Sequence, residues 1–235
     1  MNTEFFYNIS YHNLDTVIKK LDIFKNRYRL ITSIKITKNR ATYIVYDSQN
    51  NKKKVLKFIV SSYVNDNLMF IYNFFTEIKH KNFIKINSIS NYDIITMFDM
   101  DYIEGCNLFE YFINTTDRIN CYNILFNLVF AINYLHNNNI VHGDIKPNNI
   151  IINSKGEPII IDYDLCKYID KENIKSKPFG TKLFMPPELV EENIYLKKSD
   201  IWSLGLSFTI CILYKYKYIK CIENMNDTYT YKSLL

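Results

Sequence analysis

The feature that most constrains this chain is the stretch from Ile140 to Ile152, in which polar residues interrupt two apolar runs. The preceding run has apolar residues at helical spacing, and the following run is β-branched, so a helix, a polar loop and a strand are expected in this order. Within the loop, Asp144, Lys146 and Asn149 place a carboxylate, an ammonium and an amide within six residues. That set is typical of phosphoryl transfer, because one group orients a hydroxyl, one neutralises phosphate charge and one helps to hold a metal ion.

Three further motifs follow along the chain. The first is an apolar run that ends in acids and contains Asp162, which comes 18 residues after Asp144. The others are Gly-Thr-Lys-Leu-Phe-Met-Pro-Pro-Glu at 180–188 and Asp-Ile-Trp-Ser-Leu-Gly at 200–205. In order and spacing, the four motifs resemble the catalytic loop, the metal motif, the end of the activation segment and the central large-lobe helix of eukaryotic-type protein kinases. The chain is therefore identified, by resemblance, as a divergent member of that family.

The resemblance implies an α+β, two-lobed fold. A small β-rich N-lobe with one main helix is expected over 28–103, after an N-terminal helical extension over 1–27. A mostly helical C-lobe, short and truncated after the central helix, is expected over 104–235. The residue pattern predicts strands at 28–36, 41–46, 52–60 and 93–102, and helices at 14–24, 108–113 and 120–137. The resemblance implies a further helix at 65–80.

The resemblance also implies roles for individual residues. Asp144 is expected to accept the proton of a protein hydroxyl, Lys146 to stabilise the transferring phosphoryl group, and Thr181 to contact both. Asn149 and Asp162 are expected to hold Mg²⁺ or Mn²⁺. Lysine followed by proline in the catalytic loop indicates the serine/threonine type. ATP is the expected cofactor, and its expected contacts are Ile36, Val45, Lys57, Asp101, Ile103, Asn107 and Ile151.

The small lobe departs from the family pattern at two places. The first glycine of the chain is Gly105, so the expected hairpin near residue 38 has no glycine-rich phosphate loop. Glycine is used in such a loop because a Cβ blocks close approach to phosphate. Lys38 and Arg40 occupy the loop instead and offer side-chain contacts. In addition, the position of the acid that pairs with Lys57 in the family falls near Ile71.

The large lobe departs from the pattern as well. Gly143 replaces the arginine that binds a phosphorylated activation segment, so we expect activity to be independent of such phosphorylation. Asp164 replaces a glycine beside the expected metal site. Glu188 is expected to lack its usual arginine partner, because the last arginine of the chain is Arg118.

Two alternatives remain open beside an active serine/threonine protein kinase. A pseudokinase, or binding scaffold of the same fold, fits the missing glycines and the missing helix acid, because folds outlive their chemistry. A small-molecule phosphotransferase fits the His-Gly-Asp sequence at 142–144. The Lys-Pro pair and the Pro-Pro-Glu motif argue against that second alternative, because they are typical of kinases that act on proteins.

Composition narrows the setting. The 235 residues are 48% hydrophobic and carry a net charge of +5 with both signs interspersed, which indicates a solvated surface rather than a nucleic-acid partner. The five cysteines show no metal spacing, and no signal peptide or membrane span is evident, so a cytoplasmic monomer without a membrane partner is expected. The abundance of Asn, Ile, Lys and Tyr fits an A/T-rich genome such as that of a large DNA virus.

Overall fold

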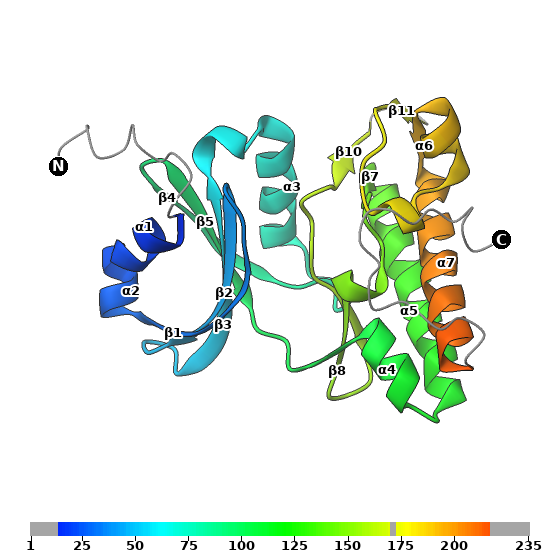
Figure 1. Cartoon of the computed structure of the whole chain (residues 1–235), viewed down its shortest axis with the longest axis horizontal. Helices are drawn as coiled ribbons and strands as arrows, with labels where there is room; N and C mark the ends of the chain where they lie inside the picture. The colour runs from blue at the N-terminus through cyan, green and yellow to red at the C-terminus, as the bar shows by residue number, and fades with distance from the viewer. Residues whose placement is uncertain (1–13, 170–172, 217–235) are drawn as a thin grey trace. The chain divides into compact units, whose positions relative to one another are not determined.

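The computed structural model describes residues 14–169 and 173–216, and the chain divides into two compact units (Figure 1). Unit 1 comprises Met1–Ile78 and Lys85–Tyr102. Unit 2 comprises Lys79–Ile84 and Ile103–Leu235. Unit 1 is built on a sheet and unit 2 mainly on helices, which confirms the predicted α+β class.

Unit 1 contains one five-stranded sheet in the order β1-β2-β3-β5-β4, and all neighbouring strands are antiparallel. The predicted strands at 28–36 and 52–60 are confirmed with their bounds. The other two predicted strands are confirmed with ends shifted by one or two residues. The observed strands are β1 (Tyr28–Ile36), β2 (Arg40–Asp47), β3 (Lys52–Val60), β4 (Ile86–Tyr92) and β5 (Ile95–Asp101).

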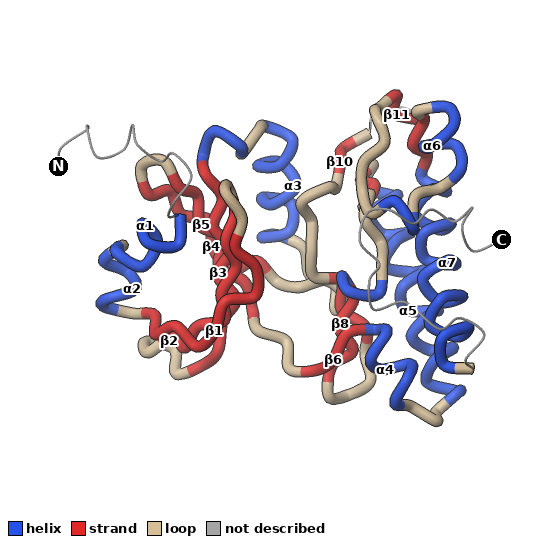
Figure 2. Tube along the Cα trace, in the orientation of Figure 1, coloured by secondary structure: helices blue, strands red, loops and turns tan. Residues whose placement is uncertain are grey.

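Helices cover both faces of this sheet, as Figures 1 and 2 show. On one face, α1 (Leu14–Lys20) and α2 (Asp22–Asn26) bury apolar side chains against alternate residues of β2 and β3. The prediction of one continuous helix over 14–24 is wrong, because Leu21 has an extended backbone with ψ of 135°. On the other face, α3 (Asp66–Glu77) begins where the Asn65 side chain accepts a hydrogen bond from the Leu68 N–H at 2.8 Å.

Unit 2 is organised around two long helices, α5 (Arg118–Asn137) and α7 (Lys197–Lys215), which lie side by side in both views. The predicted helix at 120–137 is confirmed and starts two residues earlier, where Asp117 caps it. Short sheets and helices surround this pair: β6 (Gly105–Asn107), α4 (Leu108–Asn114), β7 (Ile140–Val141), β8 (Ile150–Asn153), β9 (Pro158–Ile160), β10 (Lys167–Tyr168), β11 (Asn173–Lys175), α6 (Pro187–Glu192) and β12 (Ile194–Leu196).

The apolar run in α7 is buried along one face only. Leu204, Phe208 and Cys211 point into the core of unit 2, whereas Ile201 and Trp202 are about two-fifths exposed. Among the described residues, no helix has the length and apolar character needed to cross a membrane.

Candidate active site

The catalytic loop of the sequence lies between β7 and β8 in unit 2. The helix α5 ends at Asn137, and Asn139 then adopts a left-handed backbone with φ of 56°, which asparagine tolerates better than most residues. The chain reverses there into β7, which pairs with β10. Pro147 opens a single 3-10 turn, and β8 begins at Ile150. The loop is therefore held by a strand at each end.

The carboxylate of Asp200, in the first turn of α7, anchors the start of this loop. Its Oδ2 accepts the His142 N–H at 2.9 Å and is bonded to His136 Nε2 at 2.8 Å. Its Oδ1 accepts the Gly143 N–H at 3.0 Å and the Tyr195 hydroxyl at 2.6 Å. Burial alone disfavours the charged form, but the partners outweigh it, chiefly the hydrogen bond to His136, and hold the pKa of Asp200 below its ordinary value. Four contacts on one buried carboxylate thus fix the loop backbone to α7.

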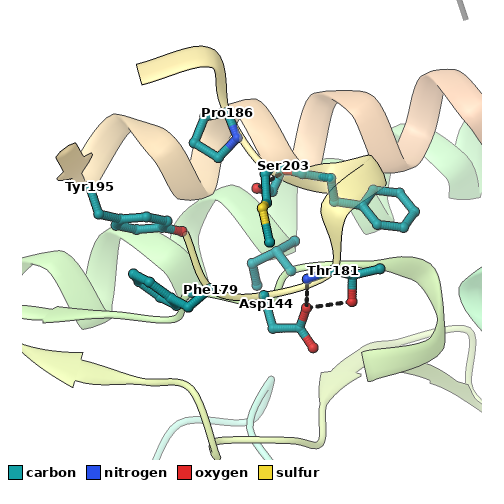
Figure 3. A pocket seen from close by; sticks show the side chains of 11 residues that line it. Asp144, Phe179, Thr181, Pro186, Tyr195 and Ser203 are labelled. Carbon is teal, nitrogen blue, oxygen red and sulfur yellow. Dashed lines mark hydrogen bonds between the residues drawn. The ribbon is translucent and has the colours of Figure 1, made fainter. Parts of the chain in front are cut away.

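The carboxylate of Asp144 is the centre of the site (Figure 3). Its Oδ1 accepts the Thr181 N–H at 2.9 Å and the Thr181 hydroxyl at 2.8 Å. Its Oδ2 accepts from Lys146 Nζ at 2.7 Å and from Asn149 Nδ2 at 3.0 Å. Lys146 Nζ also donates to the Thr181 Oγ1 at 2.7 Å. The structure therefore places Lys146, Asn149 and Thr181 each within hydrogen-bond distance of Asp144.

Two glycines allow the activation segment to approach the catalytic loop this closely. Gly143 has φ of 80°, and a Cβ on it lies 2.7 Å from the Leu165 carbonyl oxygen and 2.7 Å from the Phe179 ring. Gly180 has φ of 95°, and its Cβ position is 2.6 Å from the Gly143 carbonyl oxygen. Both the backbone and the space exclude a side chain at these positions. An arginine at position 143 would therefore strain this backbone and crowd its neighbours.

The expected metal ligands come from two neighbouring segments of unit 2. The Ile161 N–H donates to the Asn149 carbonyl oxygen at 3.0 Å, which places Asp162 next to the catalytic loop. The Asn149 amide nitrogen donates to the carbonyl and carboxylate oxygens of Asp144, so its side-chain oxygen points away from them. An amide oxygen and a carboxylate are ligands that Mg²⁺ prefers. The residues present therefore fit a magnesium ion that also binds phosphate oxygens.

Two buried rings support the metal segment. The Tyr163 hydroxyl donates to the Ile84 carbonyl at 2.9 Å and lies 3.2 Å from the Ile160 carbonyl oxygen. The His142 ring packs edge-on against the Tyr163 ring at 6.5 Å, and its Nδ1 accepts the Asp144 N–H at 3.3 Å. Burial lowers the pKa of His142, so the imidazole is kept neutral. This buried histidine therefore packs against the metal segment.

A small pocket opens beside Asp144, between the activation segment and α7 (Figure 3). The Phe179 ring packs on Tyr195 at 5.0 Å, and Lys167 Nζ lies 3.6 Å from the centre of the Phe179 ring. Beyond the pocket, Glu188 accepts a hydrogen bond from the Ser199 hydroxyl at 2.6 Å. The pocket is lined by Gly143, Asp144, Ile145, Phe179, Gly180, Thr181, Phe184, Met185, Pro186, Tyr195 and Ser203.

In unit 1, Lys57 lies on β3 and is 8% exposed. Its Nζ is 5.9 Å from the centre of the Tyr72 ring on α3, within the range of a cation–π contact. Tyr72 in turn packs on Phe98, which is paired with Lys57 across the sheet. Ile71, where the family has an acid, is fully buried and apolar. An aromatic ring of α3, rather than a carboxylate at that position, therefore contacts this lysine.

The structure corrects one expected nucleotide contact. Val45 is fully buried in the cluster formed with α1 and α2, so it faces away from Lys57. Ile44 pairs with Val55, two residues before Lys57, and successive residues of a strand point to opposite faces. Ile44 therefore takes the place of Val45 on the Lys57 face. Ile36, at the end of β1, is 45% exposed.

The remaining expected nucleotide contacts lie in both units. In unit 1, Asp101 ends β5, and burial opposes its ionisation, but hydrogen bonds from Asn87 and Lys54 prevail and lower its pKa. In unit 2, Ile103 lies half-buried before β6, and Ile151 lies in β8 opposite Asn107. The Asn107 side-chain oxygen accepts the Glu110 N–H at 2.9 Å and so caps α4.

No role was expected for the side chains of Asp200, His136 and Tyr195. The sequence does mark Asp200 as the acid that opens the apolar helix at 200–205. Once such an acid is buried, it needs partners. Of its side-chain partners, His136 lies in α5, 64 residues before Asp200, and Tyr195 lies in β12, five residues before it. No local pattern marks such distant residues.

Comparisons with known proteins agree with this geometry. A family model described as "Protein kinase domain" matches residues 37–232. The serine/threonine-protein kinase PrkC of Bacillus subtilis is 30% identical over 77% of this chain, which spans 29% of that protein. A putative serine/threonine-protein kinase of Acanthamoeba polyphaga mimivirus is 31% identical over 84% of this chain, which spans 70% of it. The chain therefore belongs to the eukaryotic-type protein kinase family.

Proposed function

We propose that this protein transfers the γ-phosphoryl group of ATP to a serine or threonine hydroxyl of another protein. The observation that carries the proposal is the carboxylate of Asp144, which is held between Lys146, Asn149 and Thr181 by hydrogen bonds of 2.7–3.0 Å. The two relatives, both named as serine/threonine-protein kinases, support the serine/threonine type.

Each residue has one task in this proposal. Asp144 accepts the hydroxyl proton of the substrate and aligns its oxygen for in-line attack. Lys146 neutralises charge that develops on the transferring group. Thr181 holds the activation segment against Asp144 and so positions both the base and the substrate chain. Reactions of this class depend mostly on positioning, which the hydrogen bonds around Asp144 provide.

Asn149 and Asp162 hold Mg²⁺ or Mn²⁺ in this proposal, and Lys57 binds the nucleotide phosphates. Held by Asn149 and Asp162, a metal ion would supply positive charge to neutralise the phosphates of ATP. Asp101, Ile103, Asn107 and Ile151 contribute to the nucleotide site. The proposal takes residues 28–103 as the N-lobe, residues 104–235 as the C-lobe, and the cytoplasm as the compartment.

A pseudokinase of the same fold is the second candidate, and one observation favours it. The hairpin between β1 and β2 has no glycine, and its Thr37 N–H and Arg40 N–H are both used within the turn. This hairpin therefore offers fewer backbone amides to phosphate than the glycine-rich loop of the family pattern does. In this candidate, the ordered catalytic loop serves binding rather than transfer.

The test is a transfer assay with labelled ATP, Mg²⁺ or Mn²⁺, and a basic protein as acceptor. Asp144→Asn and Asp162→Asn are each expected to lower transfer by about 100-fold or more, because a positioned base or metal ligand contributes on that order. The matched control is Asp117→Asn, an exposed position in the same unit where asparagine preserves the helix cap.

Transfer that both site variants abolish and the control retains supports a kinase. Equal transfer by the wild type and Asp144→Asn contradicts the assigned role of Asp144. A folded wild type that transfers nothing, to this acceptor or to itself, favours the pseudokinase.

A further inference from the structure

The β1–β2 hairpin of unit 1 closes on itself. The Thr37 N–H donates to the Arg40 carbonyl at 2.8 Å, and the Arg40 N–H donates to the Thr37 hydroxyl oxygen at 3.1 Å. These bonds make a tight turn of residues 37–40 that contains no glycine. Because two of the four backbone amides of the turn are used within it, side chains become the main means by which this hairpin can bind an anion.

A bulge in β1 decides which side chains those are. Ser33 pairs with Tyr43, but the next pair is Lys35 with Thr42, so Ile34 is an extra residue. If the bulge were absent, Ile34 would lie opposite Thr42 and Lys35 would point to the other face, because a shift of one residue reverses the direction of every side chain. The bulge therefore places Lys35 on the same face as Thr42.

Lys57 lies on that face too, because it pairs with Thr42 from the other side. Arg40 precedes Thr42 by two residues on β2, and alternation puts it on the same face. Lys35 and Lys57 are separated by two strand spacings, about 10 Å, and Arg40 is about 7 Å from Thr42 along its strand. Lysine and arginine side chains are long enough to converge across such spacings on one chain of phosphates.

The environment of the two faces differs. Ala41, Tyr43 and Val45 are fully buried on the opposite face under α1 and α2, so no anion can enter there. On the cationic face, Lys35 is exposed and Arg40 is half-exposed. The three cations Lys35, Arg40 and Lys57 are named the cationic sheet face below.

We propose that the cationic sheet face is the polyphosphate-binding site of this protein, with Lys35 and Arg40 replacing the backbone amides of a glycine-rich loop. The inference rests on the proposed function in taking ATP as the natural ligand. Its chemistry is that of any linear polyphosphate, because guanidinium and ammonium groups bind phosphate oxygens through charge-assisted hydrogen bonds.

The test measures binding to the full chain rather than transfer. Calorimetry with ATP, sodium tripolyphosphate and adenosine is performed on the wild type, Lys35→Ala and Arg40→Ala. Each substitution is expected to weaken ATP and tripolyphosphate about three- to tenfold, a range set by partly exposed charge pairs. Adenosine affinity stays unchanged. Lys35→Arg retains the charge and is expected to restore most of the affinity.

The matched control is Arg29→Ala, which removes one positive charge from the same strand and the same face. Arg29 pairs with Tyr46, which lies four residues, about 14 Å, from Thr42, the partner of Lys35 on β2. Its substitution is expected to leave all three ligands unaffected at physiological salt, because charges at that distance are screened.

Unchanged affinities in Lys35→Ala and Arg40→Ala overturn the inference, and so does an equal loss for adenosine. A wild type that binds neither ATP nor tripolyphosphate also overturns it. The proposed function is judged separately by the transfer assay. Weaker tripolyphosphate binding by the variants supports the assignment of the cationic sheet face even if no transfer occurs. Unchanged binding refutes that assignment even if the protein is an active kinase.

Discussion

Replacing Asp200 by asparagine tests whether this buried carboxylate holds the catalytic loop in place. The side chain has no solvent exposure and makes four contacts of 2.6–3.0 Å, with the backbone N–H groups of His142 and Gly143 and with the side chains of His136 and Tyr195. Asparagine has nearly the same size, so it creates no cavity. It exchanges one acceptor oxygen for an NH₂ group and removes the charge.

The magnitude follows from counting donors. Whichever way the amide turns, its NH₂ faces one backbone N–H, from either His142 or Gly143. The imidazole of His136 and the hydroxyl of Tyr195 can turn to accept, but a backbone N–H cannot. One unpaired buried donor costs about 1–3 kcal/mol, and loss of charge weakens each remaining bond by about 0.5–1 kcal/mol. We expect Asp200→Asn to lower the free energy of unfolding by about 3–5 kcal/mol, or the melting temperature by roughly 6–20 °C.

The assay is urea unfolding followed by circular dichroism, with Asp66→Asn as control. Asp66 is exposed in the first turn of α3, where loss of one charge costs less than about 1 kcal/mol. The pH dependence adds a second readout. Because the pKa of Asp200 is lowered on folding, its contribution is present above the ordinary carboxyl range near pH 4 and is lost as the pH falls through the folded pKa. An Asp200→Asn protein as stable as the control variant at pH 7 refutes this reasoning.

Three other predictions concern single contacts. Arg27→Met is expected to lower the free energy of unfolding at pH 7 by about 2–4 kcal/mol in urea titrations, because the fully buried Asp47 loses its bidentate partner. The difference between the two proteins should shrink in acid, since hydrogen bonding to Arg27 lowers the pKa of Asp47. A difference that does not depend on pH contradicts this prediction. Tyr72→Leu is expected to weaken ATP binding about two- to tenfold in calorimetry through loss of the cation–π contact with Lys57, whereas Tyr72→Phe retains it; equal effects of the two variants rule the contact out. Asn107→Ala is expected to cost about 1 kcal/mol in thermal unfolding and Asn107→Asp much less, because only alanine removes the cap of α4; equal losses speak against the cap.

Most strands and helices were predictable from the sequence because their signals are local. The runs rich in β-branched and aromatic residues over 28–36 and 52–60 and the helical stripe over 120–137 each arise within one element. The central part of the candidate site was also accessible, since Asp144, Lys146 and Asn149 lie within six residues. A loop that short has few ways to separate them.

The errors share one physical cause, which is that local patterns carry no record of distant partners. Leu21 continues the apolar helical stripe in the sequence, but its backbone is extended and divides the segment into two helices. The packing of these helices against the sheet is not visible in the local pattern. The resemblance placed Val45 among the nucleotide contacts, but strand alternation alone does not tell which face of β2 is covered. The covering helices α1 and α2 decide that.

The sequence by itself determined the order of elements, the loop that carries the catalytic groups and the family to which the chain belongs. The tertiary structure alone decided how that loop is held and which cations share a surface. Asp200 gathers donors from segments up to 64 residues away, and a one-residue bulge at Ile34 turns Lys35 toward Lys57. Both outcomes depend on pairing between distant segments, where a shift of one residue reverses the direction of a side chain.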